Sequence, residues 1–140
     1  MEVGAFRGND PEIAGQDKPT GPTILLVEDN RTLSMLTADL LHQEGFTVDL
    51  LYEGRPALEQ VRRVQYRLIL MNVNLPDVNG LDVTRQLKAD PLTCTIPIII
   101  VTAQAMQVDR ERSRQAGADA YLSKPYDVYD LFELIRQLLA

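Results

Sequence analysis

Five short apolar runs alternate with longer amphipathic segments after residue 22, and this alternation is the strongest constraint on the fold. The apolar runs, which we expect to be strands, cover residues 24–27, 46–51, 68–71, 96–101 and 120–122. The amphipathic segments, which we expect to be helices, cover residues 31–44, 55–64, 81–89, 107–116 and 128–139. Strands that are apolar throughout are typical of a sheet buried on both faces. The pattern therefore predicts an α/β fold in which helices cover both faces of a parallel sheet.

The first predicted helix carries a stripe of leucines that we expect to face the core. Its members are Leu33, Leu36, Leu40 and Leu41. Asn30 before this helix is a typical N-cap residue, and Gly45 is a typical residue at its end. Pro97 lies near the start of the fourth predicted strand, where a missing N–H group is tolerated.

Composition excludes several classes of protein. The chain has 140 residues, of which 45% are hydrophobic, which suffices for one domain with a core but not for two. Its net charge of −6 and its lack of a basic run argue against nucleic-acid binding through this domain. No apolar stretch approaches the length of a membrane span or of a signal peptide core. The single cysteine, Cys94, fits a reducing compartment, so we expect a cytoplasmic protein with no membrane partner.

Residues 1–22 differ from the rest of the chain. They are rich in glycine and proline and show little apolar periodicity. We predict that they form a flexible N-terminal extension or linker, and that residues 23–140 form the folded domain.

Polar residues follow four of the predicted strands at the point where each strand ends. Glu28 and Asp29 follow the first strand, Asn72 follows the third, Thr102 the fourth and Lys124 the fifth. In a doubly wound sheet, ligands bind beyond the carboxyl ends of the strands, where the strand order reverses. If the first and third strands are neighbours, all five side chains can face one pocket. Taken singly, each has a simpler explanation, such as acids favoured at a helix start, but their joint placement favours a shared site.

These residue types suit phosphoryl chemistry. Two adjacent carboxylates, Glu28 and Asp29, make an oxygen site for Mg²⁺. Thr102 can hydrogen-bond a phosphoryl oxygen, and Lys124 supplies a positive charge for an anionic one. The Lys124–Pro125 bond is a candidate cis peptide bond that would orient the lysine. A carboxylate at position 72 would complete the metal site and act as the nucleophile, which an amide cannot do.

Residues 23–139 resemble the receiver domain of two-component response regulators. The resemblance is carried by residues 26–30 (LVEDN), 70–76 (LMNVNLP), Gly80, 101–103 (VTA) and 121–125 (YLSKP). It implies a flavodoxin-like (βα)5 fold, which is a doubly wound parallel sheet with strand order 2-1-3-4-5. It also implies that residues 23–140 are a receiver, a phosphorelay module of signal transduction rather than an enzyme.

The resemblance implies a role for each residue near the predicted phosphoryl group. Glu28 and Asp29 match the acidic metal pair, and the backbone carbonyl of Asn74 completes the Mg²⁺ ligands. Asn72 occupies the phosphoacceptor position, which is also a metal ligand. Lys124 matches the lysine that binds phosphate.

The resemblance also implies a switch and two kinds of partner. Thr102 and Tyr121 match the switch pair, in which the threonine moves toward the phosphoryl group and the ring turns inward. The phosphoryl donor would be a histidine kinase or a phosphotransfer protein. A downstream output domain or protein would bind the switched form.

The departure from the family pattern is Asn72, which stands where receivers have an aspartate. An amide is a poor nucleophile, so acyl phosphate formation at this position should fail. Mg²⁺ should bind more weakly because the site loses one negative charge, although an amide oxygen can still be a ligand. Two origins fit this residue. The chain is either an ordinary receiver with aspartate replaced by asparagine, or a natural pseudo-receiver that binds proteins independently of phosphorylation.

Two other protein classes fit the sequence poorly. A flavodoxin needs a Ser/Thr-rich phosphate loop after its first strand, whereas this chain has acids there. A haloacid-dehalogenase-type phosphatase needs a second acid two residues after its nucleophilic aspartate, but Asp29 is followed by Asn30 and Arg31.

Overall fold

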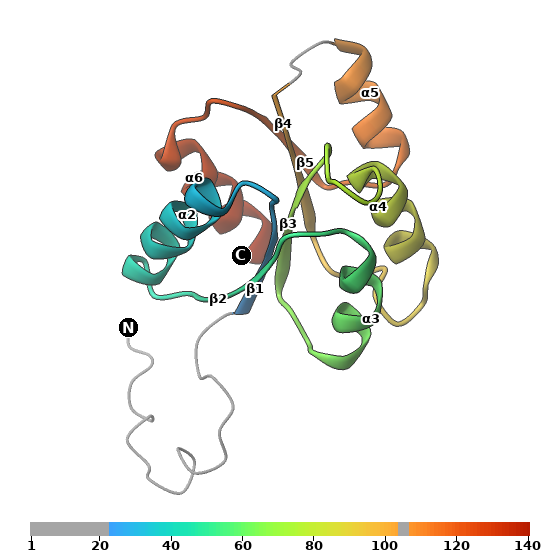
Figure 1. The fold of residues 1–140 in the computed structure, drawn as a ribbon, viewed down its shortest axis with the longest axis horizontal. Helices are drawn as coiled ribbons and strands as arrows, with labels where there is room; N and C mark the ends of the chain where they lie inside the picture. The colour runs from blue at the N-terminus through green and yellow to red at the C-terminus, as the bar shows by residue number, and fades with distance from the viewer. Residues whose placement is uncertain (1–22, 104–106) are drawn as a thin grey trace, which may run out of the picture.

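The computed structural model describes residues 23–103 and 107–140, in which five parallel strands form one sheet with helices on both faces (Figure 1). The strands are β1 (Thr23–Val27), β2 (Thr47–Leu51), β3 (Leu68–Asn72), β4 (Ile98–Thr102) and β5 (Ala120–Ser123). The helices are α2 (Arg31–Gln43), α3 (Arg55–Arg63), α4 (Gly80–Ala89), α5 (Gln107–Gln115) and α6 (Val128–Leu139). The predicted flexible extension, residues 1–22, lies outside the described residues.

The strand order is β2-β1-β3-β4-β5, and each pair of neighbours is parallel. This confirms the predicted doubly wound fold and its order. β1 and β3 are hydrogen-bonded neighbours although β2 lies between them in the chain, so the strand order reverses at this pair. The carboxyl ends of β1 and β3 therefore meet at the switch point, where a ligand site is expected.

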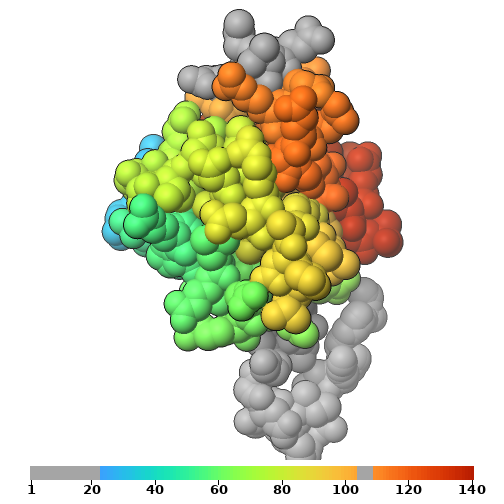
Figure 2. All heavy atoms as spheres, turned by 90° about the vertical axis from the view of Figure 1, so that its right-hand side faces the viewer, coloured from blue at the N-terminus to red at the C-terminus, as the bar shows by residue number. Residues whose placement is uncertain are grey.

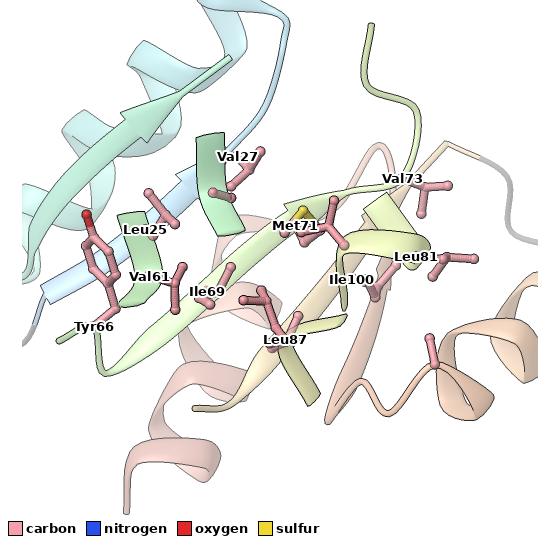
Figure 3. Close-up of a cluster of buried hydrophobic side chains, with 14 residues drawn as sticks. Leu25, Val27, Val61, Tyr66, Ile69, Met71, Val73, Leu81, Leu87 and Ile100 are labelled. Atoms are coloured by element: carbon pink, nitrogen blue, oxygen red, sulfur yellow. The ribbon is translucent and has the colours of Figure 1, made fainter. Parts of the chain in front are cut away.

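The two faces of the sheet are covered by different helices because side chains alternate along each strand. On one face, residues such as Leu25, Ile69 and Ile100 pack with α3, with α4 and with Ala116 directly after α5 (Figure 3). The outer surfaces of these three helices lie side by side in Figure 2. On the other face, residues such as Leu26 and Leu70 pack with α2 and α6. Both layers of helices are needed to bury the inner strands, since every residue of β3 and β4 is buried.

The helices and strands begin and end within two residues of the predicted bounds, and β4 shows why the bounds shift. It begins at Ile98 rather than at residue 96. The N–H group of Ile96 donates to the carbonyl of Thr93 in the preceding turn, and Pro97 has no N–H group. The first N–H group of β4 that can pair with its neighbour is therefore that of Ile98, which donates to the Asp119 carboxylate just before β5.

The leucine stripe predicted for the first helix is wrong in part. The buried residues of α2 are Ser34, Thr37, Ala38 and Leu41. Leu36 instead has 56% of its surface exposed. The four buried positions recur at the same helical spacing, and two of them are small, so this stripe lets α2 lie close to the sheet. Leu36 is thereby turned away from the core.

Candidate functional site

The carboxyl edge of the sheet brings the predicted site residues together. Asn72 is aligned with Val101, so Thr102 stands one position farther along β4. The backbone continues these alignments beyond the strands, because the N–H group of Glu28 donates to Leu51 and that of Lys124 to Thr102. The ends of the strands are thus held at one level, and the residues that follow them surround a common space. The Lys124–Pro125 peptide bond is cis.

Asn72 lies at the centre of this space, with only 6% of its surface exposed. Its side-chain nitrogen, Nδ2, donates hydrogen bonds to Oδ1 of Asp29 at 3.0 Å and to the carbonyl oxygen of Asn74 at 3.1 Å. Oε2 of Glu28 is 3.5 Å from the same nitrogen. Three oxygen atoms from two loops therefore converge on one amide nitrogen.

Glu28 links this centre to the fifth strand. Its Oε1 atom lies 2.7 Å from Nζ of Lys124, and the glutamate is 4% exposed. Its other oxygen, Oε2, accepts a hydrogen bond from the backbone N–H of Asn30. A buried carboxylate needs such partners because it has lost its hydration. Both carboxylate oxygens of Glu28 therefore have partners: Oε1 pairs with Lys124, and Oε2 accepts from the loop between β1 and α2.

The predicted switch pair lies on β4 and β5. Thr102 is buried at the end of β4, and Tyr121 is half-buried within β5. The tyrosine ring packs against the core cluster on the α5 side of the sheet, and the guanidinium of Arg110 lies 5.9 Å from its centroid. Burial, and then the nearby charge of Asp109, raise the pKa of the Tyr121 hydroxyl, while Arg110 opposes this. Tyr121 therefore connects β5 with α5 through its contact with Arg110.

Gly80 holds the turn after Asn72 against the site. Its N–H group donates to the carbonyl of Val73 at 2.7 Å. A Cβ atom at Gly80 would lie 2.0 Å from the carbonyl oxygen of Asn72, which is far inside van der Waals contact. Only glycine fits this close approach. Asn79 then caps α4, its Oδ1 accepting from the N–H of Leu81.

Asp77 is a supporting residue that sequence reasoning missed. Its carboxylate accepts hydrogen bonds from the backbone N–H groups of Gly54 and Arg55, each at 2.8 Å. Burial opposes ionisation, but these hydrogen bonds outweigh it and lower the pKa of the Asp77 carboxyl. The loop after β3 is thereby fastened to the start of α3. The contact crosses more than twenty positions of sequence, so no local pattern could have indicated it.

An apolar groove beside Lys124 was also missed. It has a volume of about 390 Å³ and runs between α2 and the loop before α6. Its lining residues are Leu33, Leu36, Thr37, Leu40, Ala103, Lys124, Pro125, Tyr126 and Val128. The leucine stripe is the available sequence signal, but helical spacing alone indicates that it faces the core. Lys124 belongs both to this groove and to the acidic site, so the two are continuous.

The oxygen atoms around Asn72 are chemically suited to Mg²⁺. Two carboxylates and one backbone carbonyl are hard oxygen ligands, and Mg²⁺ needs only one or two acids when waters complete its shell. Among residues 23–103 and 107–140, no group of three or more His, Cys, Asp or Glu side chains comes together as a metal site. Asn72 lies between Glu28 and Asp29, where a third acid would complete such a group. Glu28, Asp29 and Asn74 therefore fit the ion, while the amide presents nitrogen where an oxygen ligand would be needed.

The order of the sheet defines a flavodoxin-like α/β domain, with an acidic site at its switch point. Residues 24–136 match the response regulator receiver domain family, and the chain belongs to this family. It is therefore a receiver domain of two-component signal transduction, a class of modules that acts in phosphorelays. Receiver domains are signalling modules rather than typical enzymes.

Three relatives illustrate the match. The polar-differentiation response regulator DivK of Brucella anthropi is 42% identical over 117 residues, covering 84% of this chain and 95% of DivK. The response regulator ArlR of Staphylococcus saprophyticus is 39% identical over 116 residues, or 83% of this chain, but the match spans only 51% of ArlR. The receiver domain of the sensor histidine kinase PA1611 from Pseudomonas aeruginosa has a TM-score of 0.80 and 36% identity, covering 86% of this chain and 98% of that one. That structure has a magnesium ion coordinated in the active site cleft.

Within the part of the chain that the structure describes, no helix is both long and apolar enough to cross a bilayer.

Proposed function

We propose that this domain is the receiving module of a phosphorelay whose phosphoacceptor position is residue 72 and is blocked by asparagine. The observation that supports this most strongly is the position of Asn72 at the point where Glu28, Asp29 and the Asn74 carbonyl converge. In the aspartate form, a carboxylate oxygen would attack phosphorus and form an acyl phosphate while the donor's bond to phosphorus breaks. The uncharged amide lacks this nucleophile, so the transfer stops here.

The surrounding residues supply binding and charge neutralisation in this proposal. Glu28, Asp29 and the carbonyl of Asn74 would hold Mg²⁺, which when bound offsets the negative charge of the transferred group. Lys124 would contribute a second positive charge, since the ion pair with Glu28 already holds its ammonium beside the acidic site. Asn72 weakens the metal site because it removes one of its charges.

The switch in this proposal is the pair Thr102 and Tyr121. Phosphorylation of the aspartate form would draw Thr102 toward the phosphoryl oxygens and let the Tyr121 ring turn inward. The half-buried ring already lies at the boundary between β5 and α5, so its movement changes the face made by α5, β5 and α6. A downstream output domain or protein would read that face as a shift between two populations. The asparagine form would remain in the unphosphorylated population.

We assign the apolar groove to the phosphoryl donor, a histidine kinase or a phosphotransfer protein. A donor must bring its phosphorylated histidine to the strand ends, and the groove begins at Lys124 on the rim of that site. Leu36 is exposed there although it is a large apolar residue. Exposed apolar patches beside a functional site are typical of protein-binding surfaces. We place this exchange in the cytoplasm, where a thiol such as Cys94 stays reduced.

Intact-mass measurement tests the function. Incubation with acetyl phosphate and Mg²⁺ should add no mass to the Asn72 protein and the mass of one phosphoryl group to the Asn72→Asp variant. An Asn72→Asp variant that is folded and binds Mg²⁺ but stays unmodified would contradict the proposed function. Glu28→Gln in the same background is the matched control, since it keeps the acceptor and should lower the yield.

A second candidate function is a pseudo-receiver that binds a protein partner without phosphorylation. The hydrogen bonds of Asn72 favour it, because the amide donates to Asp29 and Asn74 and so stabilises the pocket without a phosphoryl group. Affinity capture distinguishes the two. A stable partner retained by the Asn72 form and lost on Asn72→Asp would support the pseudo-receiver. Equal or stronger retention by phosphorylated Asn72→Asp would support the phosphorelay module.

A further inference from the structure

The amide of Asn72 occupies the position that a cation would be expected to take. A carboxamide nitrogen carries two hydrogens and no accepting lone pair. Here these hydrogens point to Oδ1 of Asp29 and to the carbonyl oxygen of Asn74, and Oε2 of Glu28 is the third oxygen nearby. All three atoms are those assigned above to Mg²⁺. The nitrogen, not the oxygen, of Asn72 therefore faces the metal ligands.

We propose that the Asn72 carboxamide acts as an internal substitute for the divalent cation, stabilising the acidic pocket without metal and opposing Mg²⁺ binding. This inference rests on the proposed function for the identity of the ligands, but it concerns the resting state of the pocket rather than phosphoryl transfer. Mg²⁺ can bind only when the amide turns so that its oxygen, instead of its nitrogen, faces the ion.

Electrostatics explains why the pocket needs a substitute. Glu28 and Asp29 are adjacent carboxylates at one strand end, and like charges held close together destabilise each other. Lys124 pairs with Oε1 of Glu28, but no cation pairs with Asp29 within the described residues. One amide hydrogen of Asn72 is directed at Asp29, and Oε2 of Glu28 lies 3.5 Å from the same nitrogen, so both carboxylates feel its partial positive charge. Asn72 thus stabilises in part the negative charge of Asp29, which Lys124 does not pair with.

The same contacts oppose the metal. Binding of Mg²⁺ must break the hydrogen bonds to Asp29 and Asn74 and rotate a side chain that is almost fully buried. Each broken hydrogen bond lowers the affinity by several-fold, and the missing charge of residue 72 lowers it further. We expect Mg²⁺ to bind the Asn72 protein at least about tenfold more weakly than the Asn72→Asp variant.

Calorimetric Mg²⁺ titration and thermal unfolding of three proteins test this. The Asn72 protein should have a Tm that barely depends on Mg²⁺. Asn72→Asp should have a lower Tm than the Asn72 protein without metal and should gain several degrees when Mg²⁺ is added. Asn72→Ala, which has neither a donor nor a ligand at this position, should also have a lower Tm than the Asn72 protein without metal. Addition of Mg²⁺ should restore part of the difference. The side-chain NH₂ signal of Asn72 in an NMR spectrum should move only as Mg²⁺ saturates the site.

Two results would overturn the inference. One is a Mg²⁺ affinity of the Asn72 protein within about twofold of that of Asn72→Asp. The other is an Asn72 NH₂ signal with the shift of a solvent-exposed amide, which does not depend on whether Asn72→Ala folds. The proposed function fails separately: an Asn72→Asp variant that binds Mg²⁺ tightly but takes no phosphoryl group contradicts the function and leaves this inference standing.

Discussion

Nζ of Lys124 lies 2.7 Å from Oε1 of Glu28, so an ion pair joins residues 96 positions apart across the carboxyl edge of the sheet. The glutamate is almost wholly buried, whereas the lysine keeps some contact with solvent. A buried carboxylate that loses its partner is costly, because its desolvation is no longer compensated. This pair therefore ties β5 to β1 and at the same time positions the ammonium in the acidic site.

Replacement of this lysine separates its two roles. We expect Lys124→Met in the Asn72→Asp background to slow labelling by acetyl phosphate by about 10²-fold, since one charge on the transferred group is lost. The free energy of unfolding should fall by about 1–3 kcal/mol because Glu28 loses its partner. Labelling rates and urea denaturation measure the two effects. The double variant with Glu28→Gln should recover stability but not rate, and recovery of both would contradict the role of Lys124.

The turn after β3 should not accept a side chain at position 80. We expect Gly80→Ala to lower the free energy of unfolding by about 1–3 kcal/mol, because the new methyl group would overlap the carbonyl of Asn72. Gly45→Asn is the control. Gly45 has a positive φ of 96° and nothing near its missing Cβ, and asparagine tolerates that region. Urea denaturation should rank the control as the milder change, and the reverse ranking would contradict the close approach at Gly80.

The groove assigned to the phosphoryl donor can be tested with two neighbouring residues of α2. Leu36→Glu should slow transfer from a cognate histidine kinase or phosphotransfer protein to the Asn72→Asp variant by about tenfold or more. Labelling by acetyl phosphate should not change, because a small donor needs no docking surface. Met35→Glu is the control, since Met35 is 59% exposed but does not line the groove. Equal effects of the two substitutions on protein-dependent transfer would remove the groove from the docking surface.

A tyrosine far from the site should control stability at high pH. Burial, and then the hydrogen bond to Asp49, raise the pKa of Tyr66 from 10.0 to about 12. Because the folded pKa is raised, its stabilising contribution is present below pH 10.0 and is lost as the pH rises toward about 12. The midpoint of urea unfolding should therefore fall over this range, and less steeply in Tyr66→Phe. Identical slopes for the two proteins would contradict the raised pKa.

Much of this architecture could be predicted from sequence, and the reasons are physical. Apolar runs identify buried parallel strands, and parallel strands in one sheet end at the same edge. Glu28, Asn72 and Lys124 therefore had to lie near one another once the strand order was known. The resemblance to receivers supplied that order, which periodicity alone does not determine.

Other features depend on contacts that no local pattern encodes. Helical spacing predicted that the leucine stripe of α2 faces the core, but the buried stripe includes the polar residues Ser34 and Thr37, and its packing against the sheet leaves Leu36 exposed. The attachment of Asp77 to the start of α3 joins two separate loops. The orientation of the Asn72 amide follows from the oxygen atoms around it, which belong to different parts of the chain.

We propose above all that residue 72 is the position at which this domain receives a phosphoryl group. Fragment-ion mass spectrometry of the Asn72→Asp variant, after treatment with acetyl phosphate and Mg²⁺, tests it most directly. We predict that the added phosphoryl group maps to residue 72. A phosphoryl group on Asp29, on Asp77 or at any other residue would contradict the account.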